Sequence, residues 1–149
     1  MENELHATEE LLLLNTYRLL SRRPQSEKEL RSKLQQYGYK RKLEDLQNSI
    51  NIIVERVKKE GYIDDMKFAE WYVSQRQEFR PRSKRRLGVE LSQKGISEEI
   101  TEKVLKEYDE EKVLKKLLEK KKKDYSRKEL IKYLLGQGFG YDLITKNLI

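Results

Sequence analysis

A short block of serine, leucine and glycine occurs three times along the chain at one fixed spacing. Each block reads Ser-x3-Leu-x3-Leu-x3-Gly, which places its two leucines on one face of a helix. The blocks are Ser26, Leu30, Leu34 and Gly38; Ser83, Leu87, Leu91 and Gly95; and Ser126, Leu130, Leu134 and Gly138. A serine hydroxyl accepts a hydrogen bond from an unpaired amide at a helix start, and glycine permits the left-handed turn that ends a helix. The pattern therefore predicts three short capped helices.

Apolar residues at helical spacing also precede and follow each block. The preceding helices are predicted at residues 8–22, 64–79 and 110–124, and the following ones at residues 43–60, 97–108 and 140–149. The most regular apolar stripe is formed by Leu43, Leu46, Ile50, Ile53 and Val57, whose helix is polar on its other face. The sequence thus predicts about nine helices.

Three blocks with two flanking helices each predict an all-α fold of three tandem three-helix repeats, each similar to a helix-turn-helix unit. We assign the repeats to residues 1–62, 63–109 and 110–149. Because the blocks begin at Ser26, Ser83 and Ser126, the repeat periods are 57 and 43 residues. We expect an irregular array of this kind to be elongated and curved, with concave binding surfaces.

The composition agrees with a helical protein and narrows the classes of function. Of the 149 residues 36% are hydrophobic and 40% are charged, with two prolines and seven glycines, which favours helices around a thin core. The chain has no cysteine, so a disulfide framework and a thiolate site are excluded. The longest apolar run, residues 11–14, is too short to span a bilayer, and the acidic N-terminus is unlike a signal peptide. We expect a cytoplasmic protein with no membrane partner and no regulatory tail before the first helix.

The basic residues gather on the same part of each predicted repeat. The net charge of the chain is +7, and the segments 22–42, 76–94 and 112–132 carry +6, +5 and +7, counted from Lys, Arg, Asp and Glu. Each segment covers the turn that leads into the short capped helix and all or part of that helix. A basic surface favours nucleic acid or an acidic protein as the partner.

If the repeats stack in one orientation, these side chains form a continuous basic strip able to neutralise several phosphates or carboxylates. The residues that we assign to this predicted basic strip are Arg22, Arg23, Arg31, Arg76, Arg80, Arg82, Lys84, Arg85, Arg86, Lys94, Lys121, Lys122, Arg127 and Lys128. For any single lysine, an ordinary solvated helix face is the commoner explanation. The recurrence of the charge in all three repeats carries the hypothesis.

Two adjacent carboxylates, Asp64 and Asp65, follow Gly61 and invite a metal or acid-base interpretation. A tight connection between helices needs the same residues, because glycine ends one helix and aspartate caps the next. No histidine or further carboxylate cluster accompanies the pair in the sequence to complete a ligand set. We therefore favour caps over a metal site.

The aromatic residues after this pair are Phe68, Trp71, Tyr72 and Phe79, which could stack on bases. At helical spacing such residues more often belong to a core, and we favour that role. Nucleophilic catalysis has no support, since the one histidine, His6, lies in an N-terminus that we expect to be frayed. We expect no catalytic residues, no cofactor and no small-molecule substrate.

A helix-turn-helix reader of DNA is the alternative function that the turns suggest. In that motif, the helix after the glycine enters the major groove. The corresponding helix here, residues 97–108, carries Glu98, Glu99, Glu102 and Glu107 against two lysines, a net charge of −2. Phosphates repel such a helix, which disfavours this alternative without excluding it.

The segment that begins at Gly61-Tyr62-Ile63-Asp64-Asp65 resembles the signature of the RecX family. It continues with Phe68, Ala69, Tyr72, Val73 and Arg76, and then with Arg82 to Arg86, Glu90, Leu91, Lys94, Gly95 and Ile96. The segment from Leu20 to Leu34 is also similar to the family, so the resemblance covers nearly the whole chain. It departs from the family at Ser83-Lys84, where glycine is common, and in its dense run of lysines at residues 120–123.

The resemblance implies a regulator, not an enzyme. Such a protein lodges in the groove of the RecA recombinase filament on single-stranded DNA and inhibits strand exchange and ATP hydrolysis. Its contact with single-stranded DNA would be weak or indirect, and we expect a monomer. The resemblance also implies an architectural role for its signature residues, which here are Gly61, Asp64, Asp65, Phe68, Ala69, Tyr72, Leu91 and Gly95.

Overall fold

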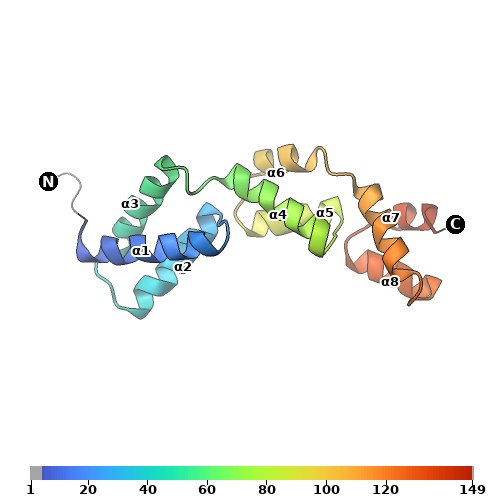
Figure 1. Ribbon diagram of the computed structural model, residues 1–149, viewed down its shortest axis with the longest axis horizontal. Coiled ribbons are helices and arrows are strands. Elements are labelled where there is room, and N and C mark those ends of the chain that lie inside the picture. Colours follow the sequence, from blue (N-terminus) through green and yellow to red (C-terminus); the bar gives the residue numbers. More distant parts are fainter. Residues whose placement is uncertain (1–4, 149) are drawn as a thin grey trace. The chain divides into compact units, whose positions relative to one another are not determined.

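The computed structural model describes residues 5–148, and this part of the chain is helical, as predicted (Figure 1). Its nine helices are α1 (Ala7–Arg22), α2 (Glu27–Lys40), α3 (Leu46–Lys59), α4 (Asp65–Phe79), α5 (Lys84–Gln93), α6 (Glu98–Leu105), α7 (Glu110–Lys121), α8 (Arg127–Gly136) and α9 (Tyr141–Lys146). No strand occurs between residues 5 and 148. The all-α class is confirmed. In that same range, every helix is too short or too polar to cross a membrane.

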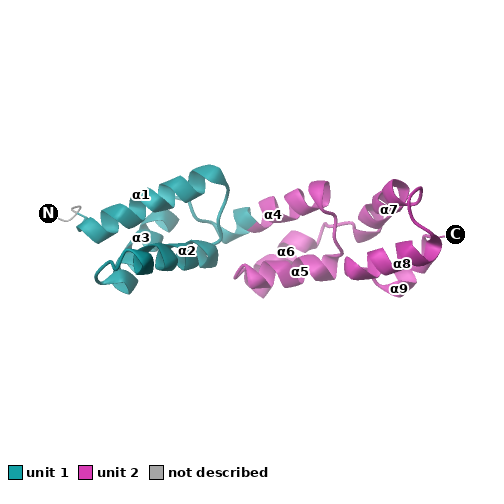
Figure 2. Ribbon diagram, turned by 90° about the horizontal axis from the view of Figure 1, so that it is seen from below, with its two compact units in different colours: residues 1–68 teal, residues 69–149 magenta. Residues whose placement is uncertain are grey.

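The chain divides into two compact units, Met1–Phe68 and Ala69–Ile149 (Figure 2). The first unit contains α1, α2, α3 and the first turn of α4. The second unit contains the rest of α4 and the helices α5 to α9.

The core of the first unit is built by the predicted apolar stripe of α3 and the leucines of the first block. Ile53 and Val57 of α3 are fully buried, as are Leu30 and Leu34 of α2 and Leu12 of α1. Burial of each such side chain contributes about 2 kcal/mol of transfer free energy. The three helices therefore fold around one shared core.

In the second unit the leucines of the other two blocks are buried in the same way. Leu87 and Leu91 of α5 are fully buried, and Leu130 and Leu134 of α8 are at most 5% exposed. Ile144 of α9 is also fully buried. Each short capped helix thus turns its two leucines inward, as the spacing predicts.

The serines of the three blocks cap their helices. The hydroxyl of Ser26 accepts a hydrogen bond from the amide of Glu29 at 3.1 Å, and that of Ser83 accepts one at 3.0 Å from the amide of Arg86. Ser126 and Glu129 form the third cap at 3.2 Å. The Glu129 carboxylate accepts in return from the Ser126 amide, and these hydrogen bonds hold the pKa of Glu129 below its usual value.

Two of the three block glycines supply the left-handed turn, and the third does not. Gly95 and Gly138 have φ angles of 83° and 98°, as expected for a residue that ends a helix. Gly38 lies inside α2, which runs on to Lys40, so the predicted turn at Gly38 is wrong. An added Cβ at Gly38 would lie 2.2 Å from Cδ1 of Leu46. A side chain at position 38 would therefore have to displace the Leu46 side chain of α3.

Candidate interaction surface

In the first unit, most of the basic strip residues have carboxylate partners. Nη2 of Arg23 lies 2.8 Å from Glu29, and Nε of Arg31 lies 3.0 Å from Glu27. Arg31 also donates to the side-chain oxygen of Asn51 at 2.7 Å. Arg22, in the last turn of α1, is exposed. These ion pairs neutralise part of the positive charge that we expected to be available for a binding partner.

The Asp64–Asp65 pair caps two different helices. Asp64 accepts from the amide of Lys67 at 3.2 Å in the first turn of α4, and Asp65 accepts from the amide of Glu27 at 3.0 Å at the start of α2. Burial raises the pKa of Asp65 above its usual value. A hydrogen bond from Lys58 is the main cause that lowers the pKa of Glu27. Among residues 5–148, no group of three His, Cys, Asp or Glu side chains could hold a metal ion.

In the second unit, two arginines of the strip converge on one carboxylate. Nε of Arg82 lies 3.1 Å from Oε1 of Glu90, and Nε of Arg76 lies 3.7 Å from the same atom. The hydroxyl of Tyr72 donates to this oxygen at 2.8 Å, and burial raises the pKa of Tyr72. The Arg82 side chain is only 12% exposed. Arg82 thus holds the segment before α5 against that helix and offers little surface to a partner.

The start of α5 also contacts the turn after α8. The amide of Ser83 donates to the carbonyl of Gln137 at 3.2 Å, and Nη1 of Arg86 donates to the carbonyl of Gly136. A Cβ at Gly138 would lie 2.3 Å from Oγ of Ser83. Only glycine fits this turn against α5, because any larger residue would push the two segments apart.

Tyr108, in the segment after α6, holds the residue before the cap of α5. Its hydroxyl donates to the carbonyl of Arg82 at 2.6 Å. Burial raises the pKa of Tyr108 to about 12. The hydroxyl therefore stays protonated and able to donate this hydrogen bond at any physiological pH.

The remaining basic residues of the second unit are more accessible. Arg80, Arg85, Lys122, Arg127 and Lys128 are exposed, and Lys84, Lys94 and Lys121 are half-buried. Nζ of Lys122 lies 3.1 Å from Glu119, and Nη1 of Arg127 donates to the carbonyl of Leu148 at 3.2 Å. Nζ of Lys121 lies over the rings of Tyr125 and Tyr133, 5.7 and 5.3 Å from their centroids. Arg80, Arg85 and Lys128 are therefore the positions of this unit best suited to a partner. The continuity of the strip along the whole chain stays a prediction.

The aromatic residues of α4 divide between core and surface. Phe68 and Tyr72 are buried, as predicted, and Trp71 is half-buried. Phe79 is 69% exposed, so its assignment to the core is wrong. It shares a helical face with Tyr72 but is the last residue of α4, so no further turn of that helix covers its ring.

His6 is not in a frayed segment. It is the N-cap residue of α1, and its backbone amide donates to the Glu9 carboxylate at 3.2 Å. The side chain of Glu9 ties the helix start together, as in a capping box. The position of His6 is therefore explained by its role at the start of α1.

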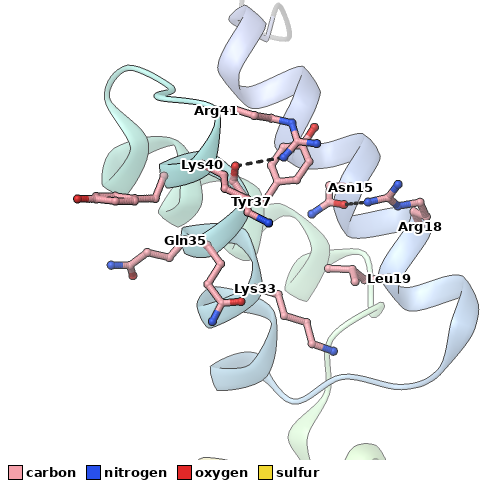
Figure 3. Close-up of a pocket in the computed structure, with 10 residues that line it drawn as sticks. Asn15, Arg18, Leu19, Lys33, Gln35, Tyr37, Lys40 and Arg41 are labelled. Carbon is pink, nitrogen blue, oxygen red and sulfur yellow. Dashed lines mark hydrogen bonds between the residues drawn. The ribbon is translucent and has the colours of Figure 1, made fainter.

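A groove between α1 and α2 contains basic residues that lie outside the predicted strip (Figure 3). Its lining residues are Asn15, Arg18, Leu19, Lys33, Gln35, Gln36, Tyr37, Tyr39, Lys40 and Arg41. The sequence carries a signal for it, since Lys33 and Tyr37 of α2 and Arg41, its C-cap residue, recur every four residues. The pairing of this face with Arg18 could not be predicted, because it depends on how α1 packs on α2.

Comparison with known proteins gives one consistent result. The family model described as the second three-helix domain of RecX matches residues 64–105. A protein of Chlorobium phaeobacteroides named regulatory protein RecX is 37% identical over 137 residues, which cover 88% of this chain and 87% of that protein. A protein of the same name from Caldanaerobacter subterraneus is 34% identical over 139 residues, 90% of this chain and 67% of that protein.

The fold is also that of solved structures. The crystal structure of RecX from Lactobacillus salivarius superimposes with a TM-score of 0.75 at 24% sequence identity, covering 97% of this chain and 96% of the other. A second crystal structure, of a regulatory protein RecX, gives a TM-score of 0.70 at 17% identity. At these identities the likeness shows a shared fold.

Proposed function

The chain belongs to the RecX family of regulatory proteins, and from this we propose that it binds the RecA filament on single-stranded DNA and inhibits the recombinase. Inhibition would cover both strand exchange and ATP hydrolysis. The protein would act without a catalytic site of its own, as a monomer, and the proposed partner implies a cytoplasmic location.

Family membership is the observation that carries the proposal, and the surface of the second unit supports it. Arg80, Arg85 and Lys128 are exposed there, and no ion pair is found for them within the described residues. Such side chains can meet phosphates or carboxylates of a nucleoprotein filament without first breaking an internal contact. Arg82 would contribute to binding only indirectly. Its ion pair with Glu90 fixes the chain segment on which Arg85 lies.

The alternative, a DNA reader of the helix-turn-helix type, is disfavoured by the charge of α6. Glu98, Glu99 and Glu102 of this helix are all exposed. A helix that enters the major groove approaches phosphates on both sides, and exposed carboxylates oppose that approach. Recognition of a filament does not require α6 to enter a groove of DNA.

Binding to immobilised oligothymidylate, bare or coated with RecA and a slowly hydrolysed ATP analogue, tests the proposal. We expect binding to the coated strand to be at least about tenfold tighter than to the bare strand, and to weaken as salt rises. Arg85→Glu should reduce binding to the filament. The control Lys59→Glu, an equal charge change at an exposed residue of α3, should not.

Two results would contradict the proposal. One is equal binding to the bare and the coated strand. The other is tight binding to particular duplex sequences in the absence of RecA, which would favour the DNA reader.

A further inference from the structure

The groove between α1 and α2 has a cationic rim supplied by two helices. In Figure 3, Asn15, Arg18 and Leu19 of α1 are drawn opposite Lys33 and Tyr37 of α2 and Arg41, the residue that follows α2. The groove is open to solvent and has a volume of about 650 Å³, within the range of ligand sites. None of the ten residues that line it is acidic, so its four cations share one concave surface of a single sign.

Neutral groups hold two of these cations in place. Nη2 of Arg18 donates to Oδ1 of Asn15 at 2.7 Å. The guanidinium of Arg41 lies 3.8 Å from the centroid of the Tyr37 ring and donates to the Tyr37 carbonyl at 3.5 Å. Both guanidinium groups are thus oriented without being neutralised.

This arrangement differs from that of the arginines elsewhere in the first unit. Arg23 and Arg31 lie against Glu29 and Glu27, where the charge is balanced internally. An arginine oriented by a ring and a carbonyl keeps N–H groups that can meet an incoming carboxylate in a bidentate pair. The two guanidinium groups of the groove can therefore accept an anionic ligand.

The floor of the groove indicates which anion fits. Leu19 and the half-buried Tyr37 give it an apolar surface, and the amide side chains of Asn15 and Gln36 can both donate and accept hydrogen bonds. A peptide offers the matching groups, which are carboxylates, backbone amides and an apolar side chain. Arg41 covers one face of the Tyr37 ring, which limits the stacking of a nucleic-acid base on it.

We propose that the α1–α2 groove is a docking site for an acidic peptide segment of a partner protein, with an apolar side chain of that segment on Leu19 and Tyr37. Arg18 and Arg41 would bind its carboxylates, and Lys33 and Lys40 would extend the positive rim. Since the arginines are already oriented, less side-chain entropy is lost on binding. The binding of a peptide to this groove can be tested without RecA.

Fluorescence anisotropy with the full chain tests the site, using a short fluorescein-labelled peptide of alternating glutamate and leucine. We expect saturable binding at micromolar protein, and weaker binding of a matched peptide with glycine in place of leucine. Arg41→Glu should weaken the binding of the leucine peptide by at least about tenfold. Lys40→Glu, at an exposed residue whose loss leaves the core intact, should weaken it in the same direction. The control Lys59→Glu should leave it unchanged.

Labelled oligothymidylate of similar length serves as the competing probe. The proposal is overturned if the leucine peptide does not bind, or if Arg41→Glu and Lys40→Glu leave its binding unchanged. It is also overturned if these variants, together with Tyr39→Ala, weaken the binding of oligothymidylate but not that of the peptide. That last result would identify the groove as a nucleic-acid site, with the exposed ring of Tyr39 as its stacking surface.

Discussion

The arginines of this protein have two kinds of surroundings, and the difference decides what each can do. Arg82 lies against Glu90 with only 12% of its side chain exposed, so its charge is paired within the protein. Arg85, three residues further along the chain, is exposed. Positive charge in a sequence segment therefore does not by itself identify the side chains that meet a partner.

Replacing Arg82 and Arg85 separately should distinguish these two roles. Arg82→Ala leaves the Glu90 carboxylate with only the more distant Arg76 and should lower the free energy of unfolding by about 2 kcal/mol, a figure reduced for the residual exposure of the pair. Arg85→Ala should change it by less than about 0.5 kcal/mol. Urea unfolding followed by circular dichroism measures both values.

Equal stability of the two variants would contradict the structural role of Arg82. The double variant Arg82→Ala with Glu90→Gln is a useful control. It removes the uncompensated charge and should recover part of the lost stability.

At the scale of helices and turns, the positive-φ glycines differ in what surrounds them. Gly61, after α3, has a φ of 81° and no atom within 4 Å of the place where a Cβ would lie. Gly138, after α8, has a φ of 98°, and a Cβ there would meet the side chains of Ser83 and Arg86 of the second block. The first turn needs glycine only for its backbone, whereas the second also needs it for the contact with the start of α5.

Alanine at these two glycines should therefore have unequal costs. Gly61→Ala should destabilise the protein by about 1 kcal/mol, the cost of a left-handed conformation in a residue with a Cβ. Gly138→Ala adds the overpacking against Ser83 and should cost about 3 kcal/mol. Thermal unfolding curves of the two variants provide the comparison. Similar shifts in Tm would show that the α8 turn does not pack on α5 in solution.

The sequence predicts elements well where the cause is local. The caps at Ser26, Ser83 and Ser126 depend on residues three positions apart, and all three form. The predicted turn at Gly38 is wrong because α2 continues past this residue and Leu46 of α3 lies close to it. The spacing of the block carries no information about either. The same limit explains why the contact of Gly138 with Ser83 could not be predicted.

The candidate site follows the same division. The sequence does not show that Arg85 is exposed and Arg82 is largely buried, because both arginines lie in one basic run. The carboxylate partner of Arg82 is Glu90, which lies further along the same segment in α5. The contacts of α4 with Glu90 depend on how the two helices pack. The α1–α2 groove likewise needs two helices to meet before its four cations share a surface.

At the scale of the whole chain, three sequence blocks are distributed over two compact units. Contacts between the start of α5 and the turn after α8 join the second and third blocks within one unit. Asp65, at the start of α4, caps α2 and so belongs to the first unit. The repeat boundaries at residues 62 and 109 stay a prediction from the sequence. The two compact units are defined by contacts between helices, including contacts between different blocks, and not by the spacing of the blocks.

Inhibition of the RecA filament is proposed for this chain, and its most direct test is the rate of ATP hydrolysis by the cognate RecA on single-stranded DNA during a titration with this protein. We predict inhibition at less than one molecule of protein per RecA. Arg85→Glu should lose inhibition while keeping the circular dichroism and Tm of the parent protein, and Lys59→Glu should retain it. An unchanged rate of hydrolysis at several-fold excess of folded protein over RecA would contradict the account.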